Sequence, residues 1–278
     1  MISIRAKAYR GGAEGGARVA DRSVTDTLKG STIHNDWIVN YRNDEAERSA
    51  EELVERTLGL AGLPKGAKVL DAGCGTGTNS RRLARAGLKV TGVDFSEYAL
   101  GIAERGSAGR SIEYRPGDLT RLDLPTASFD GVFCVGVLMH VPELDAALSE
   151  LVRVLKPGGK LVLAETNASS PEMLAFRLYW KRNGKVRVVR APSGIETWSE
   201  TPEGPLLARK MFMPWLIRAL AKRGMVLEHR KSSDLTELPI YFGSPIVKKA
   251  LYRLNRFWLA IRGPASLAVG NILILRKS

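Results

Sequence analysis

The sequence has few of the residues that build disulfide frameworks or metal sites. Its 278 residues include two cysteines, Cys74 and Cys134, and three histidines that lie far apart in the chain. Two cysteines cannot cross-link a disulfide-rich domain, and no histidines have the spacing of metal ligands. We therefore expect no disulfide framework, no metal ion and a reducing, cytoplasmic setting.

Long apolar segments are also missing. No apolar run approaches the ~18 residues that a membrane-spanning helix needs. The N-terminal stretch MISIRAKAYRGGAEGGARVADRS has no apolar region of the kind found in secretory signals, so we expect none. A hydrophobic content of 44% with 26% charged residues is typical of globular chains, and the length suffices for a buried core.

Positive charge is concentrated in the C-terminal part of the chain. The net charge is +13, and residues 168–278 alone hold 20 basic and 7 acidic side chains. These residues therefore account for the whole excess. An anionic partner would meet this part of the molecule.

Apolar runs and helical patterns alternate through the first half of the chain. After an amphipathic helix at 44–60, we expect strands at 68–71, 89–94, 112–115, 129–137 and 160–165, with helices at 78–86, 96–104 and 143–155. Short apolar strands separated by helices predict a parallel sheet that is covered on both faces.

The remaining segments are interpreted from their composition. Residues 1–43 are expected to form a mobile arm and lid segment, and residues 44–278 a single domain. This domain has two halves: residues 44–167, in which strands and helices alternate regularly, and residues 168–278, which are basic. The second half contains insertions at 168–208 and 232–270, a helix at 212–223, and strands at 225–230 and 271–278.

A glycine-rich turn follows the first strand. In VLDAGCGTGTNS, glycines occupy positions 73, 75 and 77, where they permit positive φ and close approach of a ligand. The helix that follows directs N–H groups at an anion, and Asp94, at the end of the second strand, suits ribose hydroxyls. A dinucleotide fingerprint needs glycine at 78 or 80, and an NTPase phosphate loop needs Gly-Lys-Ser/Thr; neither is present.

The turn and GVDFS, which ends in Ser96, resemble two motifs of the class I S-adenosylmethionine-dependent methyltransferases. GDLTRLDLP, FDGVFCVGVLMHVPE and LVRVLKPGGKLVLAE continue the resemblance in order, over about residues 67–166. The resemblance implies an α/β fold with a Rossmann-like seven-stranded, mostly parallel sheet, helices on both faces and an antiparallel last strand, NILILRKS. It also implies S-adenosyl-L-methionine as methyl donor and S-adenosyl-L-homocysteine as product.

The resemblance also implies roles for individual residues. The turn would meet the methionine carboxylate of the donor, and Asp71 would hold its amino group or order the turn. Asp94 would bind the ribose, Phe95 would lie against the adenine, and Asp118 would accept a hydrogen bond from the adenine amino group. The expected donor site comprises Asp71, Gly73, Cys74, Gly75, Gly77, Asp94, Phe95, Ser96, Asp118, Leu119 and Val135.

Three residues are candidates for the acceptor side. His140 follows the fourth strand, and because imidazole titrates near neutrality it is the candidate general base for an acceptor that must lose a proton. Alternatively, it lines the donor pocket or caps the following helix. Trp37 and Tyr41 either form a lid over the donor and contact substrate, or pack on the outside of the sheet. Cys134 is interpreted as a small core residue.

The basic half contains a second amphipathic helix. PIVKKALYRLNRFWLAIRGP, residues 245–264, places apolar and basic residues at helical spacing. Its apolar stripe could pack on the domain, or the helix could contact a membrane surface or the anionic head of an amphiphilic substrate. RNA binding, with Tyr179 or Trp180 stacked on bases, is the third interpretation.

These patterns lead to an expected function. We expect a methyltransferase acting by direct in-line displacement on oxygen or nitrogen of a small or amphiphilic, anionic or lipid-linked acceptor. The loop GVLMHVPE lacks the N-P-P-Y-type tetrapeptide of adenine and cytosine amino methyltransferases. The alternatives are an RNA methyltransferase that uses the basic C-terminal face, and a donor-binding interaction module without turnover. The oligomeric state is left open.

Overall fold

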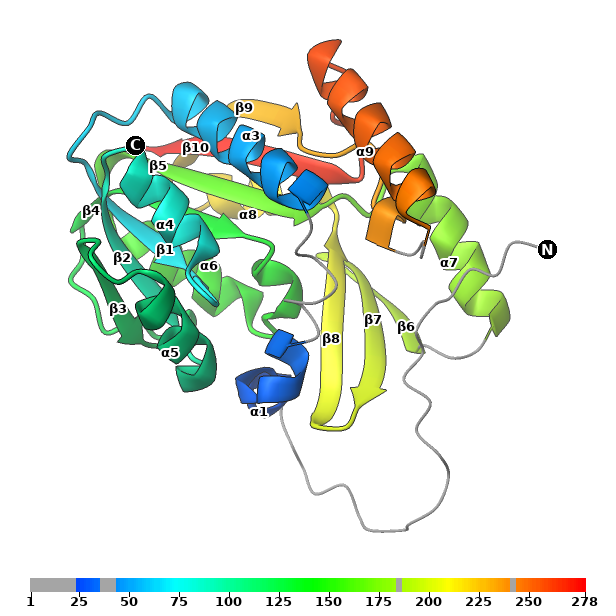
Figure 1. The fold of residues 1–278 in the computed structure, drawn as a ribbon, viewed down its shortest axis with the longest axis horizontal. Helices are drawn as coiled ribbons and strands as arrows, with labels where there is room; N and C mark the ends of the chain where they lie inside the picture. Colours follow the sequence, from blue (N-terminus) through cyan, green and yellow to red (C-terminus); the bar gives the residue numbers. More distant parts are fainter. Residues whose placement is uncertain (1–23, 36–43, 184–186, 241–243) are drawn as a thin grey trace.

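The computed structural model describes residues 24–35, 44–183, 187–240 and 244–278. Its central sheet has seven strands: β1 (Lys68–Ala72), β2 (Lys89–Asp94), β3 (Ile112–Pro116), β4 (Phe129–Val135), β5 (Leu155–Thr166), β9 (Met225–Ser232) and β10 (Gly270–Lys277). Their spatial order is β3-β2-β1-β4-β5-β10-β9 (Figure 1). β10 runs antiparallel to β5 and β9, and β1 to β5 pair in parallel. The predicted Rossmann-like sheet with an antiparallel last strand is confirmed.

Helices cover both faces of this sheet. Successive side chains of a strand point to opposite faces, so Val69 and Leu70 enter different cores. Val69 packs with Leu83 beneath α3 (Asp44–Ala61) and α4 (Thr78–Arg85). Leu70 packs with Leu148 beneath α6 (Leu144–Arg153) and α8 (Met213–Ala221). Because both faces are buried, the strands read as continuous apolar runs in the sequence.

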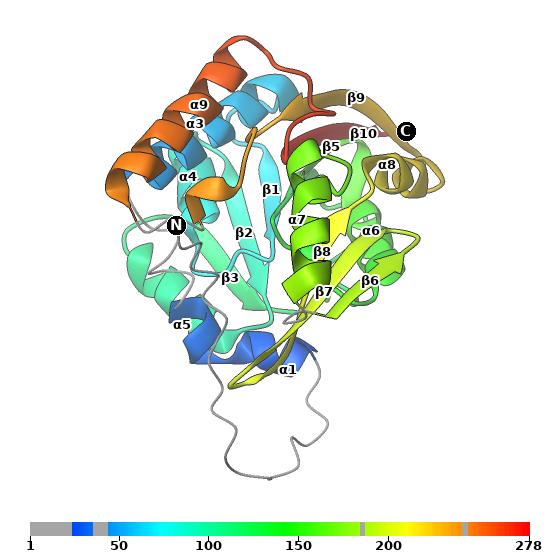
Figure 2. The same ribbon diagram turned by 90° about the vertical axis from the view of Figure 1, so that its right-hand side faces the viewer.

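The insertion after β5 is more regular than the sequence suggested. It forms α7 (Pro171–Asn183) and a three-stranded antiparallel sheet of β6 (Arg187–Ala191), β7 (Gly194–Thr201) and β8 (Gly204–Met211). Figure 2 shows this small sheet in front of the main one, with β8 nearest to it. A bridge between Asn167 and Met211 joins β8 to the end of β5. The insertion therefore stands over the carboxyl edge of the main sheet.

The second insertion carries the predicted amphipathic helix. It contains a short 3-10 turn, η2 (Leu238–Ile240), and α9 (Pro245–Ala260). α9 lies beside α3 in both ribbon views, on the outside of the molecule (Figures 1 and 2).

Part of the N-terminal segment, for which we expected a mobile arm, is helical and packs on the small sheet. Residues 24–35 include α1 (Val24–Lys29), and Val24, Leu28 and Ile33 are buried against Leu207 of β8. The sequence did not reveal this helix because six residues are too few to show a helical period. The domain boundaries at residues 43 and 167 remain predictions.

Candidate active site

The glycine turn between β1 and α4 has left-handed backbone at three positions. The φ angles of Gly73, Gly75 and Gly77 are +75°, +51° and +73°. A Cβ atom at Gly73 would lie 2.5 Å from Val137 Cγ1, and one at Gly77 would lie 2.4 Å from the Tyr114 hydroxyl oxygen. A Cβ atom at Gly75 would meet nothing within 4 Å. The turn therefore packs tightly at both ends and leaves its middle open to a ligand.

Asp71, at the end of β1, is bonded to the helix that follows the turn. Its carboxylate is buried and accepts a hydrogen bond from the Ser80 hydroxyl of α4 at 2.5 Å. Burial raises its pKa to about 6. Cys74 is also buried, and burial raises the pKa of its thiol, so the thiol is protonated at neutral pH and is no nucleophile.

Asp94 joins the turn to the end of β2. Its Oδ2 accepts a hydrogen bond from the Gly75 N–H at 2.8 Å, and its Oδ1 accepts one from the Ser96 N–H at 2.9 Å. Burial raises its pKa, and these two donors oppose the rise. The Ser96 hydroxyl in turn caps α5 (Glu97–Gly106) by accepting from the Ala99 N–H. Each carboxylate oxygen has two lone pairs, so Asp94 can still accept ligand hydroxyls.

A small cavity of about 50 Å³ lies beside these groups. It brings together six of the predicted residues: Gly73, Asp94, Phe95, Asp118, Leu119 and His140. The Asp118 side chain is exposed and held in place by Thr120, whose N–H and hydroxyl both donate to Asp118 Oδ1 at 2.8 Å. The other predicted donor residues, Asp71, Cys74, Gly75, Gly77, Ser96 and Val135, do not line this cavity.

His140 lines the cavity from the segment that follows β4. It ends the 3-10 turn η1 (Leu138–His140) after β4, and its Nδ1 lies 2.6 Å from the Leu207 carbonyl oxygen. Since a carbonyl only accepts, Nδ1 carries the proton and Nε2 is the basic nitrogen. Burial lowers the pKa of His140 to about 4. The pKa of this partly buried imidazole thus lies below the neutral range on which the sequence argument relied, and its role as general base stays a prediction.

Glu165 is a buried carboxyl group that the sequence analysis did not single out. It lies at the end of β5, and its Oε1 accepts a hydrogen bond from the Leu138 N–H at 3.0 Å. Burial raises its pKa to about 8, although the charges of Lys210 and Arg209 oppose the rise. Its Oε2 has no hydrogen-bond partner among the described residues. The sequence does contain a signal for Glu165: like Asp94, it is an acidic residue at the end of an apolar strand.

The N-terminal segment forms the outer wall of the cavity. Thr25 and Leu28 of α1 line it, and the Leu28 carbonyl oxygen lies 2.9 Å from His34 Nε2. The Glu203 carboxylate, in the turn between β7 and β8, accepts from the Thr32 N–H at 3.1 Å. The residues predicted as a lid, Trp37 and Tyr41, lie outside the described part of the chain.

Glu165→Gln should reduce the loss of stability with rising pH. The Glu165 pKa rises from 4.5 to about 8 on folding, so its carboxyl group contributes stability below pH 4.5 that is lost by about pH 8. Glutamine keeps an oxygen for the Leu138 N–H and has no proton to release. Thermal unfolding between about pH 5 and pH 9 should show the variant gaining several degrees on the wild type. A pH-independent difference would contradict the raised pKa.

The sequence and fold were compared with known proteins. Residues 70–163 match a family model described as a methyltransferase domain. The chain is 37% identical over 148 residues to a sterol 24-C-methyltransferase of Yarrowia lipolytica, covering 49% of this chain and 37% of that protein. It is 42% identical over 105 residues to a ubiquinone biosynthesis O-methyltransferase of Idiomarina loihiensis, covering 37% and 43%. The chain thus spans about half or less of the length of the curated relatives it matches.

A solved structure extends the likeness of fold to most of the chain. The magnesium protoporphyrin IX methyltransferase of Synechocystis has a TM-score of 0.59 and 20% identity, covering 92% of this chain and 99% of that one. At this identity the likeness concerns the fold alone. The matched domain model, the ordered motifs and the strand order agree that residues 70–163 carry a methyltransferase domain of the class I S-adenosylmethionine-dependent type.

Proposed function

We propose that this protein transfers a methyl group from S-adenosylmethionine to a small, amphiphilic acceptor. The observation that carries the proposal is the cavity where Asp94, Asp118 and His140 meet. It lies where the strand order reverses between β1 and β4, which is where open α/β sheets bind their ligands.

The donor would be held by residues of the first half of the chain. The sulfonium group of the donor supplies an electrophilic methyl group. We assign Asp94 to its ribose hydroxyls, Asp118 to its adenine amino group, and Phe95 to the adenine face. The open backbone at Gly75 and the N-terminus of α4 suit the methionine carboxylate.

The donor is larger than the cavity, so α1 must move when it binds. Sites for ligands of this size have volumes of roughly 300–1,000 Å³, against about 50 Å³ here. Thr25 and Leu28 of α1 line the cavity, and this short helix is held by the packing of Val24 and Leu28 with Leu207. We infer that α1 opens for donor entry and closes to exclude water.

The acceptor would approach between η1 and the small sheet. His140 is neutral near pH 7, with Nε2 able to take a proton from an acceptor hydroxyl or amine. The names of the relatives include both a sterol 24-C-methyltransferase and a ubiquinone biosynthesis O-methyltransferase. These names support a lipid-like acceptor, and they add carbon to oxygen and nitrogen as acceptor atoms.

An amphiphilic acceptor suggests where the protein works. We propose a cytoplasmic protein that reaches a membrane surface through the basic segment 245–264. Among the described residues no helix is both long and apolar enough to cross a bilayer. RNA methylation and donor binding without turnover are less favoured, because the names of the two relatives refer to methyl transfer to a sterol and in ubiquinone biosynthesis.

Asp94→Ala should abolish detectable binding of S-adenosylhomocysteine or weaken it by at least tenfold. The loss of a charged acceptor for ribose hydroxyls accounts for an effect of this size. Asp130→Ala is the matched control, because its Oδ2 also accepts a backbone N–H, from Lys68 at 2.8 Å, at the opposite edge of the sheet. Calorimetric titration measures both variants. Equal affinities in Asp94→Ala and wild type would refute the ribose assignment.

His140→Asn should lower turnover by about a hundredfold or more, in the range of general base catalysis. Asparagine keeps an N–H for the Leu207 carbonyl but removes the basic Nε2. Because the His140 pKa is about 4, wild-type rates should show no inflection from this residue between about pH 6 and pH 9. His229→Asn, on β9, is the control. Near-normal rates in His140→Asn would leave the residue a structural role only.

Transfer of labelled methyl from S-adenosylmethionine into a cell extract tests the proposed function. The extract is then separated into lipid, RNA, protein and aqueous small-molecule fractions. Label in the lipid or small-molecule fraction supports the proposal. Label in RNA, together with binding that weakens steeply with salt, would replace it with the RNA alternative.

A further inference from the structure

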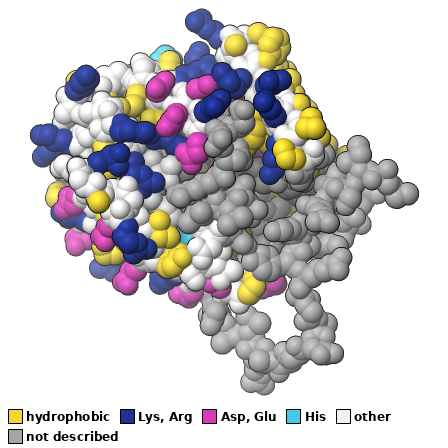
Figure 3. Space-filling view, viewed as in Figure 1, with side chains coloured by type: hydrophobic (Ala, Val, Ile, Leu, Met, Phe, Trp, Pro, Cys, Tyr) yellow, Lys and Arg dark blue, Asp and Glu magenta, His cyan; other side chains and the backbone are white. Residues whose placement is uncertain are grey.

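The outward face of α9 carries large apolar side chains that no described residue covers. With 3.6 residues per turn, Ile246, Phe257 and Ile261 lie on one side of this helix, and Leu254 lies next to them. Their exposed fractions are 82%, 61%, 54% and 43%. Large exposed apolar patches mark interaction sites in folded proteins. Figure 3 shows hydrophobic and basic side chains mixed along α9, at the upper right of the molecule.

The opposite face of α9 fixes the helix to the domain. Asn255 is 3% exposed, and its Oδ1 accepts from the Thr236 N–H at 3.0 Å while its Nδ2 donates to the Thr236 carbonyl at 3.1 Å. The Trp258 ring covers Gly263, where a Cβ atom would lie 2.1 Å from it. These contacts hold α9 without the outer apolar residues. The interpretation that the whole apolar stripe packs inward is therefore wrong for the outward residues.

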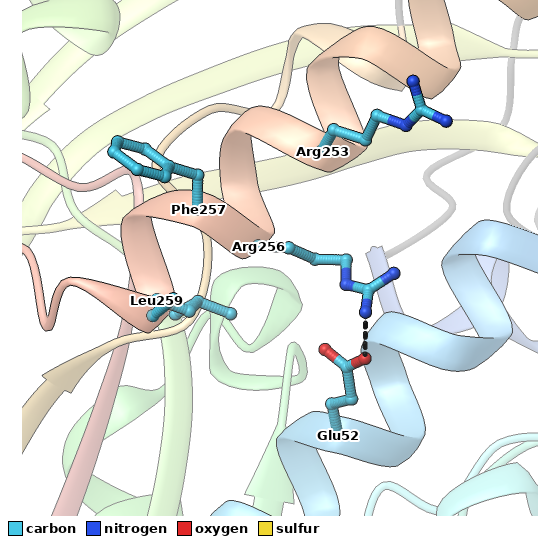
Figure 4. Close-up of a pocket in the computed structure, with 6 residues that line it drawn as sticks. Glu52, Arg253, Arg256, Phe257 and Leu259 are labelled. Carbon is cyan, nitrogen blue, oxygen red and sulfur yellow. Dashed lines mark ion pairs between the residues drawn. The ribbon is translucent and has the colours of Figure 1, made fainter.

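Basic side chains border the exposed apolar face. Lys249, Arg253 and Arg256 are exposed, and α9 contains no acidic residue. Arg253, Arg256 and Phe257 also line an open groove of about 490 Å³ between α9 and α3. Figure 4 shows Arg256 reaching across the groove to Glu52 of α3, with which it forms an ion pair at 3.4 Å.

We propose that the outward face of α9 docks on the surface of an anionic phospholipid bilayer. Ile246, Phe257 and Ile261 would enter the interface between headgroups and acyl chains, and Lys249 and Arg253 would meet lipid phosphates. Helices with an apolar face bordered by bases bind membranes in this way. A symmetric contact with a second copy would instead bring these basic side chains together. RNA phosphates would pair with the basic side chains, but the apolar side chains would remain exposed to water.

The biological role of docking through α9 rests on the proposed function, since the bilayer would supply the amphiphilic acceptor. Binding of the protein to a bilayer can be measured without an acceptor and without turnover. The donor cavity belongs to other elements, so donor binding reports on the proposed function separately. Variants on α9 should bind S-adenosylhomocysteine with wild-type affinity.

Co-sedimentation of the full chain with lipid vesicles tests the proposal. Vesicles contain equal parts of phosphatidylcholine and phosphatidylglycerol, or phosphatidylcholine alone. We expect binding to the anionic vesicles and at least tenfold weaker binding to the neutral ones. Phe257→Ser should weaken binding about tenfold, and Arg253→Gln about fivefold, the value expected for one basic residue near the surface. Glu52→Gln should strengthen it, because a negative charge is lost and Arg256 is released.

Matched controls separate docking through α9 from the general effect of removing any exposed apolar or basic side chain. Val226→Ser removes an apolar side chain that is 46% exposed, and Lys89→Gln removes an exposed base far from α9 in the sequence. Both should bind vesicles like the wild type. Equal binding to both vesicle types, or equal losses in Phe257→Ser and Val226→Ser, would overturn the proposal. A dimer in sedimentation that Phe257→Ser dissociates would overturn it in favour of a second copy.

Discussion

The proposed donor site is organised around a hydrogen bond from the Gly75 N–H to the Asp94 carboxylate at 2.8 Å. It connects the turn after β1 to the end of β2, so that two neighbouring strands present one continuous polar surface. The bond requires the positive φ of Gly75, which residues with a side chain adopt only with strain. The glycine pattern and the aspartate are therefore parts of a single arrangement. A second hydrogen bond, from the Ser96 N–H at 2.9 Å, holds the other oxygen of the same carboxylate.

The same edge of the sheet gathers buried titratable groups from several elements. Burial raises the pKa of Asp71, Asp94 and Glu165 and lowers that of His140, so each shift favours the neutral form. The faces of the sheet, in contrast, are filled with apolar side chains. Asp71, Asp94 and Glu165 are buried at the edge where the chemistry is proposed, whereas His140 is partly exposed there. In a dry site, fixed dipoles act more strongly on a reacting group than they would in water.

The donor half could be predicted because each of its features is local in sequence. The glycine turn, the aspartate that ends β2 and the apolar strands can each be recognised from a few consecutive residues. None of them requires knowledge of contacts between distant parts of the chain. The small sheet could not be predicted in this way, since residues such as Arg209 are buried only because Glu196 pairs with them at 2.8 Å. The pKa of His140 likewise depends on burial beneath β8. The pattern of α9 showed an amphipathic helix, but only the contacts of Asn255 decide which side faces outward.

A crystal structure of the full chain with S-adenosylhomocysteine tests the central claim most directly. We predict that the ribose hydroxyls lie within hydrogen-bond distance of Asp94 and that the adenine lies beside Asp118. We also predict that α1 is displaced from its present contacts with Leu207 or closed over a larger cavity. A nucleoside bound elsewhere, with Asp94 still bonded only to backbone N–H groups, would contradict this placement of the donor.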